Sequence, residues 1–167
     1  MLLQKLGIAA PEGAGVDYEK FTVGDLKEAT VIASYLASLY PDPESAFIGV
    51  HELIVNAVEH GNLEIGYEKK SELIENNLWA EEIERRMAMP HNESKEVEIR
   101  LYRCASSIKL YIKDQGKGFQ WQEYLDISSE RAADKHGRGI ALSNIISFDS
   151  LHYIGNGSEV CCVVGAV

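Results

Sequence analysis

The sequence predicts an α/β fold of the α+β type, a two-layer sandwich with helices on one face of a mixed, mostly antiparallel sheet. The first half of the chain carries helical apolar stripes between short breaks, which predicts helices. The second half carries segments of alternating apolar and polar residues joined by short turns, which predicts antiparallel strands. Because 167 residues with 46% hydrophobic content can bury one core, one globular domain is expected.

The chain starts with a segment of small residues, Gly and Pro, residues 1–17, which we expect to be a loosely attached arm or linker. Phe21 to Val23 is predicted to form a short edge strand. Asp25 is then placed to cap a helix that runs to about Tyr40. The inner side of this helix is predicted to consist of Leu26, Ala29, Ala33, Leu36 and Tyr40.

The next helix is the element around which we expect the rest of the chain to be organised. A tight break at Pro41 to Glu44 precedes it, and Pro43 suits a first helical turn. We expect the helix to end near Gly61. At about 100° per residue its side chains separate into two groups. The apolar side holds Phe47, Val50, Ile54, Ala57 and Val58, and the polar side holds Glu52, Asn56, Glu59 and His60.

A second helical region follows from Leu63 to Met89 and carries much of the negative charge. We interpret it as a solvated helical hairpin packed by one apolar stripe, with a dedicated partner-binding surface as the alternative. The stripe is predicted to consist of Ile74, Leu78, Ile83 and Met87.

Two predicted hairpins follow. Val97 to Cys104 and Ile108 to Lys113 alternate apolar and polar residues and form the first, which delivers Asp114 at a strand end. The last hairpin joins Leu151 to Ile154 with Glu159 to Val164 through a Gly-rich turn.

Between the hairpins we expect a polar loop and one helix. The loop covers residues 120–135, and the helix runs from Gly139 to Phe148 with an apolar stripe.

Composition excludes several function classes. A formal charge of −10 disfavours direct, sequence-independent binding to nucleic acid or to an anionic membrane. No apolar run reaches the roughly 18 to 20 residues that span a bilayer, and the start lacks a signal-peptide pattern. We therefore expect a cytoplasmic protein. The cysteines Cys104, Cys161 and Cys162 lie in strand-like apolar runs, so they are predicted to pack in the core rather than to bind metal.

The polar side of the central helix suits magnesium–nucleotide chemistry. The amide oxygen of Asn56 is a hard, neutral ligand for Mg²⁺. Glu52, one turn earlier, is placed to orient or deprotonate an attacking hydroxyl. The alternative is that an ordinary surface helix carries Glu and Asn outward with no further role.

Two glycine clusters follow in an order that an ATP site needs. Asp114 offers a carboxylate to the exocyclic amine of adenine, and Gly116 and Gly118 let the backbone approach a ligand, although such a pattern is also an ordinary strand-to-loop turn. Gly137 and Gly139 precede a predicted helix, whose first amides favour phosphate. In the same cluster Arg138 either reaches a phosphate or points to water, and His136 is interpreted as a loop residue.

These three clusters together resemble the N box and the two glycine boxes of the GHKL ATP-binding superfamily, over about residues 20–165. The motifs are His51-Glu52-x-x-x-Asn56-x-x-x-His60-Gly61, Asp114-x-Gly116-x-Gly118-Phe119 and Gly137-x-Gly139-Ile140. The motif around Asn56 and the short segment between the glycine boxes most resemble the anti-sigma-factor serine kinases.

The resemblance implies a role for each matching residue. Glu52 corresponds to the catalytic base, Asn56 to the Mg²⁺ ligand, and Asp114 to the carboxylate that reads adenine. The remaining expected nucleotide-binding residues are His60, Gly116, Gly118, Gly137, Arg138 and Gly139. The implied cofactors are ATP and Mg²⁺, and the implied fold is the superfamily's α/β sandwich.

The resemblance also implies partners. Kinases of this group phosphorylate a serine of a small anti-anti-sigma protein and alternately hold a sigma factor, and a homodimer is one possible assembly. The sequence departs from the pattern of this group at two places, one of which bears on partner identity and the other on nucleotide affinity. A helical insertion at about 63–95 interrupts the domain predicted to span 18–167, and the segment from Gln120 to Lys135 lacks a Gly-rich phosphate lid.

Two further hypotheses remain. One is a non-catalytic nucleotide-sensing module, and the other is the ATP-binding domain of a histidine kinase system.

Overall fold

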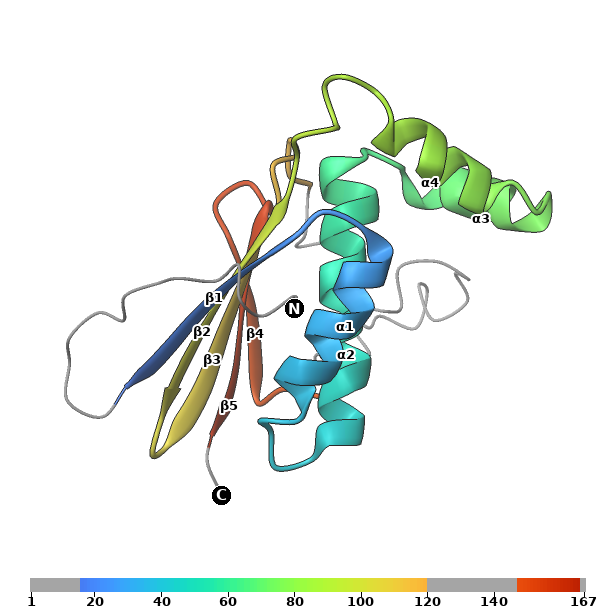
Figure 1. Ribbon diagram of the computed structural model, residues 1–167. Coiled ribbons are helices and arrows are strands. Elements are labelled where there is room, and N and C mark those ends of the chain that lie inside the picture. Colours follow the sequence, from blue (N-terminus) through green and yellow to red (C-terminus); the bar gives the residue numbers. More distant parts are fainter. Residues whose placement is uncertain (1–15, 120–146, 166–167) are drawn as a thin grey trace.

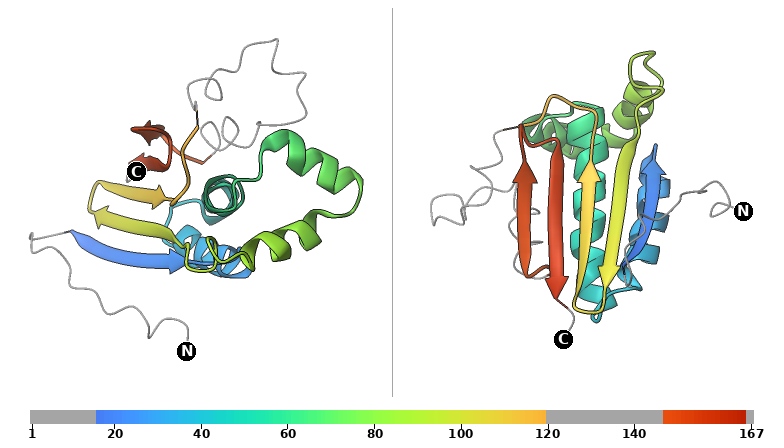
Figure 2. Two further views of the ribbon diagram at one scale, coloured as in Figure 1. Left: turned by 90° about the horizontal axis from the view of Figure 1, so that it is seen from above. Right: turned by 90° about the vertical axis from the view of Figure 1, so that its left-hand side faces the viewer.

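The protein folds as an antiparallel sheet with helices on one of its faces (Figures 1 and 2). This computed structural model describes residues 16–119 and 147–165. Every pairing between the described strands is antiparallel. The five strands lie in the order β1 (Asp17–Val23), β2 (Val97–Cys104), β3 (Ser107–Lys113), β5 (Glu159–Gly165) and β4 (Ser150–Ile154). The predicted two-layer α+β architecture is confirmed. The sheet is antiparallel rather than mixed, because tight turns close the β2–β3 and β4–β5 hairpins and can join only antiparallel neighbours.

The edge strand β1 (Asp17–Val23) pairs with β2 (Val97–Cys104), with Phe21 opposite Ile99. The predicted strand is confirmed in type and position but starts earlier, because the ladder with β2 continues outward to Asp17. That residue was predicted to belong to the N-terminal arm, the rest of which lies outside the described residues except for Val16.

Helix α1 (Leu26–Ala37) begins at the predicted cap, because the Glu28 backbone N–H donates to Asp25 Oδ1 at 2.7 Å. The helix ends at Ala37, earlier than predicted. The side chain of Tyr40 is nonetheless buried beyond the helix end, and the predicted inner stripe is buried except for Leu26, which packs against the core at its rim.

The central helix consists of α2 (Pro43–Asn56) continued by a π-helix, η2 (Ala57–Asn62). Pro43 occupies the first turn as predicted. The prediction for Glu59 is wrong, because its side chain is 1% exposed rather than on the polar side. A π-helix has more residues per turn than an α-helix, so a wheel of 100° per residue fails after Asn56.

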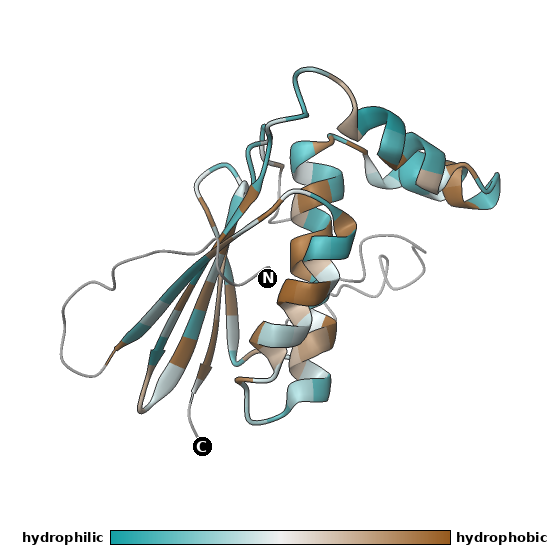
Figure 3. Ribbon diagram, viewed as in Figure 1, coloured by the Kyte–Doolittle hydropathy of each residue, from teal (hydrophilic) through white to brown (hydrophobic). Residues whose placement is uncertain are grey.

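The predicted helical hairpin consists of α3 (Tyr67–Glu75) and α4 (Trp79–Met87), and it projects from the body of the molecule (Figure 1). Most of its residues are hydrophilic (Figure 3). The predicted stripe is correct for Ile83 and Met87, which pack toward the core, whereas Ile74 and Leu78 are exposed. Leu73, one position earlier on α3, is buried instead.

The strands β3 (Ser107–Lys113), β4 (Ser150–Ile154) and β5 (Glu159–Gly165) confirm both predicted hairpins. Core packing is confirmed for the buried Cys162, whereas Cys104 and Cys161 are only half-buried. Within the described ranges, no helix has the length and apolarity needed to cross a membrane. The predicted helix from Gly139 lies outside these ranges except for its last two residues, Ser147 and Phe148, which are buried but not helical.

Candidate functional site

A cavity of about 520 Å³ opens between the end of the central helix, the start of α3 and the ends of β3 and β5. Four of the predicted site residues line it, and they come from segments far apart in the sequence: Asn56, His60, Asp114 and Gly118. The predicted N-box helix and the first glycine cluster therefore meet at one site. The second cluster, with Gly137, Arg138 and Gly139, lies outside the described residues.

Asn56 and Glu52 are linked by a hydrogen bond along the helix. Asn56 is 9% exposed, and its Nδ2 donates to Glu52 Oε1 at 3.1 Å. This bond orients the amide so that Oδ1 of Asn56 remains as an acceptor. Glu52 is half-buried and is not among the residues that line the cavity, so it lies one turn behind Asn56 rather than in the wall.

Asp114 follows the last residue of β3 and is fixed at both its backbone and its side chain. Its N–H donates to the Ser158 carbonyl at 2.9 Å, and the Gly116 N–H donates to Asp114 Oδ1 at 2.7 Å. Burial raises the pKa of the Asp114 carboxyl to about 6, which the hydrogen bond from Gly116 opposes. The side chain thus offers a carboxyl acceptor in a partly desolvated wall.

Gly61 and Gly116 allow the central helix and the β3 end to approach each other closely. A Cβ on Gly61 would lie 2.3 Å from Asp114 Cγ, and a Cβ on Gly116 would lie 2.3 Å from the Gly61 carbonyl oxygen. Gly116, which was predicted to let the backbone approach a ligand, lies against the backbone of Gly61 in the structure. No separate role was predicted for Gly61, although its place in the motif around Asn56 was the available signal.

Gly118 adopts a φ of +76°, and a Cβ there would lie 2.1 Å from the Asn156 carbonyl oxygen. This turn aims the following residue, Phe119, at the cavity, where its ring packs edge-on against Tyr153 with centroids 5.1 Å apart. Tyr153 is a lining residue that sequence reasoning missed, and burial raises the pKa of its phenol. Aliphatic side chains complete the apolar walls: Leu53, Ile65, Ile112 and Val160.

His60 closes the cavity from the π-helix. Its Nδ1 donates to the Ile65 carbonyl, and its ring packs on Tyr67 with centroids 3.9 Å apart. Burial lowers the pKa of His60 to about 4, so the imidazole is neutral near pH 7. With Nδ1 acting as the donor, the other ring nitrogen, Nε2, is an acceptor that meets no hydrogen-bond partner in the described part of the chain.

Two further contacts fix the end of the central helix. The Gln115 N–H donates to Asn62 Oδ1 at 2.7 Å, which joins the helix to the loop after β3. Glu59 forms an ion pair with Lys70 of α3 at 2.5 Å. Burial raises the pKa of Glu59, and the neighbouring lysine opposes that shift. Neither contact could be predicted from the sequence, because each depends on how two separate elements pack together.

Asn56 contributes a side-chain amide oxygen to the cavity lining that could hold a cation. No group of three or more His, Cys, Asp or Glu side chains suited to a metal occurs within residues 16–119 and 147–165. Magnesium bound with a nucleotide takes most of its ligands from phosphates and water, so one amide oxygen such as Asn56 Oδ1 meets the requirement on the protein side.

In comparisons with known proteins, no protein-family model matches this chain, and no curated protein matches it.

Proposed function

We propose that this protein binds ATP with Mg²⁺ in the cavity and acts as a serine-protein kinase of the anti-sigma-factor type with a GHKL fold. One observation carries the proposal: Asn56 and Asp114, distant in the sequence, line the same cavity between apolar walls. A purine base fits between such walls, because its faces are apolar and its edge carries hydrogen-bonding groups. Asp114 would accept from the exocyclic amine of adenine.

The role of each residue follows from its contacts. Asn56 would hold Mg²⁺ through Oδ1, and the ion would neutralise phosphate charge. Glu52 would orient or deprotonate the attacking serine hydroxyl. Its Oε1 accepts a hydrogen bond from Asn56 Nδ2, which fixes the carboxylate relative to the amide proposed to hold Mg²⁺. Gly118 and the predicted Gly137, Arg138 and Gly139 would contact the phosphates.

The partner is proposed from the resemblance. A small anti-anti-sigma protein would supply the serine, and a sigma factor would be held alternately in a cytoplasmic switch. Phosphoryl transfer needs mainly positioning and charge neutralisation, so no covalent nucleophile on this chain is required.

Two experiments test the proposal in order. Isothermal titration with Mg-ATP should give binding that Asn56→Ala abolishes, while unchanged affinity in that variant would overturn the site assignment. Incubation with labelled ATP and small anti-anti-sigma proteins from the same genome should then transfer label to a serine. Glu52→Ala should retain nucleotide binding and lose the transfer.

A second candidate is a non-catalytic nucleotide sensor, because Glu52 is not among the lining residues of the cavity. In that case the wild-type protein and Glu52→Ala would bind Mg-ATP equally well, and neither would label any partner. Neighbouring genes that encode an anti-anti-sigma protein or a phosphatase would favour the kinase.

A further inference from the structure

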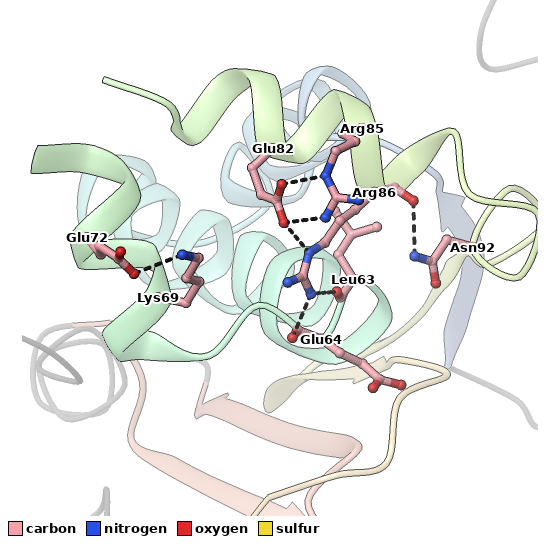
Figure 4. Close-up of polar contacts among 8 residues, drawn as sticks. All are labelled: Leu63, Glu64, Lys69, Glu72, Glu82, Arg85, Arg86 and Asn92. Atoms are coloured by element: carbon pink, nitrogen blue, oxygen red, sulfur yellow. Dashed lines mark hydrogen bonds and ion pairs between the residues drawn. The ribbon is translucent and has the colours of Figure 1, made fainter. Parts of the chain in front are cut away.

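Glu64 lies at the edge of the cavity, where three cationic side chains converge on it. Lys117 Nζ lies 3.0 Å from Glu64 Oε2, and Lys95 Nζ lies 4.0 Å from Oε1. Arg86 Nη1 donates to the Glu64 carbonyl at 2.9 Å, and also to that of Leu63 (Figure 4). These contacts connect the end of the central helix to α4 and to the loop after β3.

The backbone of Glu64 is strained. Its φ is +53°, in the left-handed region that residues with a Cβ seldom adopt. Such a conformation persists where surrounding contacts determine it, and it is enriched at ligand clamps and switches. The two hydrogen bonds from Arg86 keep this segment in place independently of the Glu64 carboxylate.

Lys117 has no equivalent among its neighbours in the wall. Of the lining residues that the structure describes, it alone carries a lysine or arginine side chain, whereas Glu64, Glu68, Asp114 and Glu159 carry carboxyls. Arg100 pairs with Glu159 and so offsets one of these charges. A polyphosphate entering the cavity would therefore meet Lys117 as its nearest described cation in the wall.

We propose that the Glu64–Lys117 ion pair is a latch at the edge of the nucleotide cavity, and that Lys117 leaves Glu64 to bind the phosphate chain. This inference rests on the proposed nucleotide binding. Lys117 is 83% exposed, and water screens exposed ion pairs so strongly that breaking this one is easy. A phosphate chain offers more negative charge and more acceptor oxygens than one carboxylate.

The latch makes Glu64 and Lys117 act in opposite directions, although each substitution breaks the same ion pair. Glu64→Gln frees Lys117 for phosphate and removes a competing negative charge, so nucleotide affinity should rise. Lys117→Gln removes the phosphate contact, so affinity should fall. A pair that only stabilises the fold would respond in the same direction to both substitutions.

The test is isothermal titration of the full chain with Mg-ATP and, separately, with adenosine, which lacks phosphate. For Mg-ATP we expect Lys117→Gln to weaken binding by about fivefold and Glu64→Gln to tighten it by about threefold, the range of an exposed charge pair. Adenosine affinity should stay within about twofold in both variants, because the ion pair contacts no part of a neutral nucleoside. Added salt should reduce both effects on Mg-ATP.

Matched controls are Lys109→Gln and Glu75→Gln, which change the same charges at exposed positions outside the cavity lining. Both should leave the two affinities unchanged. The latch is overturned if Mg-ATP binds and the two test variants shift its affinity in the same direction or not at all, or if adenosine shifts as much as Mg-ATP. If the wild-type protein binds neither ligand, the proposed function fails as well.

Discussion

Gly61→Ala tests most directly whether the central helix and the end of β3 meet as described. The added Cβ would lie 2.3 Å from Asp114 Cγ and 2.6 Å from its Cβ and Oδ2, distances that real structures essentially never show. Either the Asp114 side chain or the helix end must move. Overpacking of this kind destabilises a protein by about 1–3 kcal/mol. We expect a loss of stability in the upper half of this range, because the hydrogen bond from the Gly116 N–H already fixes the Asp114 side chain.

The matched control is Gly66→Ala, since Gly66 lines the same cavity but a Cβ there would meet nothing within 4 Å. We expect this variant to stay within about 1 kcal/mol of the wild type, because open space removes the overpacking contribution. Urea unfolding followed by circular dichroism measures both variants, with the slope checked for constancy. In a thermal scan, 2–3 kcal/mol corresponds to a fall in Tm of about 4–12 °C for a chain of this size.

The same pair of variants reports on the site. Gly61→Ala should weaken Mg-ATP binding more than Gly66→Ala does, because only the first displaces the carboxyl proposed to read adenine. If Gly61→Ala is as stable as the wild type, or costs less stability than Gly66→Ala, then the close approach of Gly61 to Asp114 is refuted.

Three further predictions test separate features. Because burial raises the pKa of Asp114 to about 6 from 3.8, its contribution to stability is fully present below pH 3.8 and is lost as pH rises through 6. The difference in free energy of unfolding between the wild type and Asp114→Asn should thus fall by about 1–2 kcal/mol from pH 4 to 7, after discounting for partial exposure. A difference that does not change with pH would contradict the raised pKa of Asp114. Lys70→Met leaves the buried Glu59 carboxylate without its cation, so it should destabilise the protein by about 3 kcal/mol at pH 7 and by less at pH 5. Urea unfolding measures both values, and equal losses at the two pH values would argue against a charged Glu59. Asn77 lies between α3 and α4 with a φ of +56°. Asn77→Gly should leave the stability of the protein unchanged, whereas Asn77→Ala should lower it by about 1 kcal/mol. A thermal scan in which the two variants are equally stable would exclude the left-handed conformation.

Local signals in the sequence determined most of the secondary structure. The cap at Asp25, the proline at the first turn of α2 and the alternation in β2 and β3 each depend on residues within a few positions of one another. They can therefore be recognised without knowing the tertiary arrangement. The same kind of local pattern predicted that Asn56 lies on the polar side of a helix and that Asp114 lies at the end of a strand.

Tertiary structure decided which of those residues meet. The Glu64–Lys117 pair joins positions 53 residues apart, and no local pattern predicts it. Glu59 was predicted to face outward, but the π-helical turn redirects it and α3 covers it with Lys70. Gly61 reads as an ordinary helix end in the sequence, yet its missing Cβ makes room for Asp114. Burial, close approach and ion pairing depend on surfaces brought together by the whole fold, whereas helix and turn preferences act only between near neighbours in the chain.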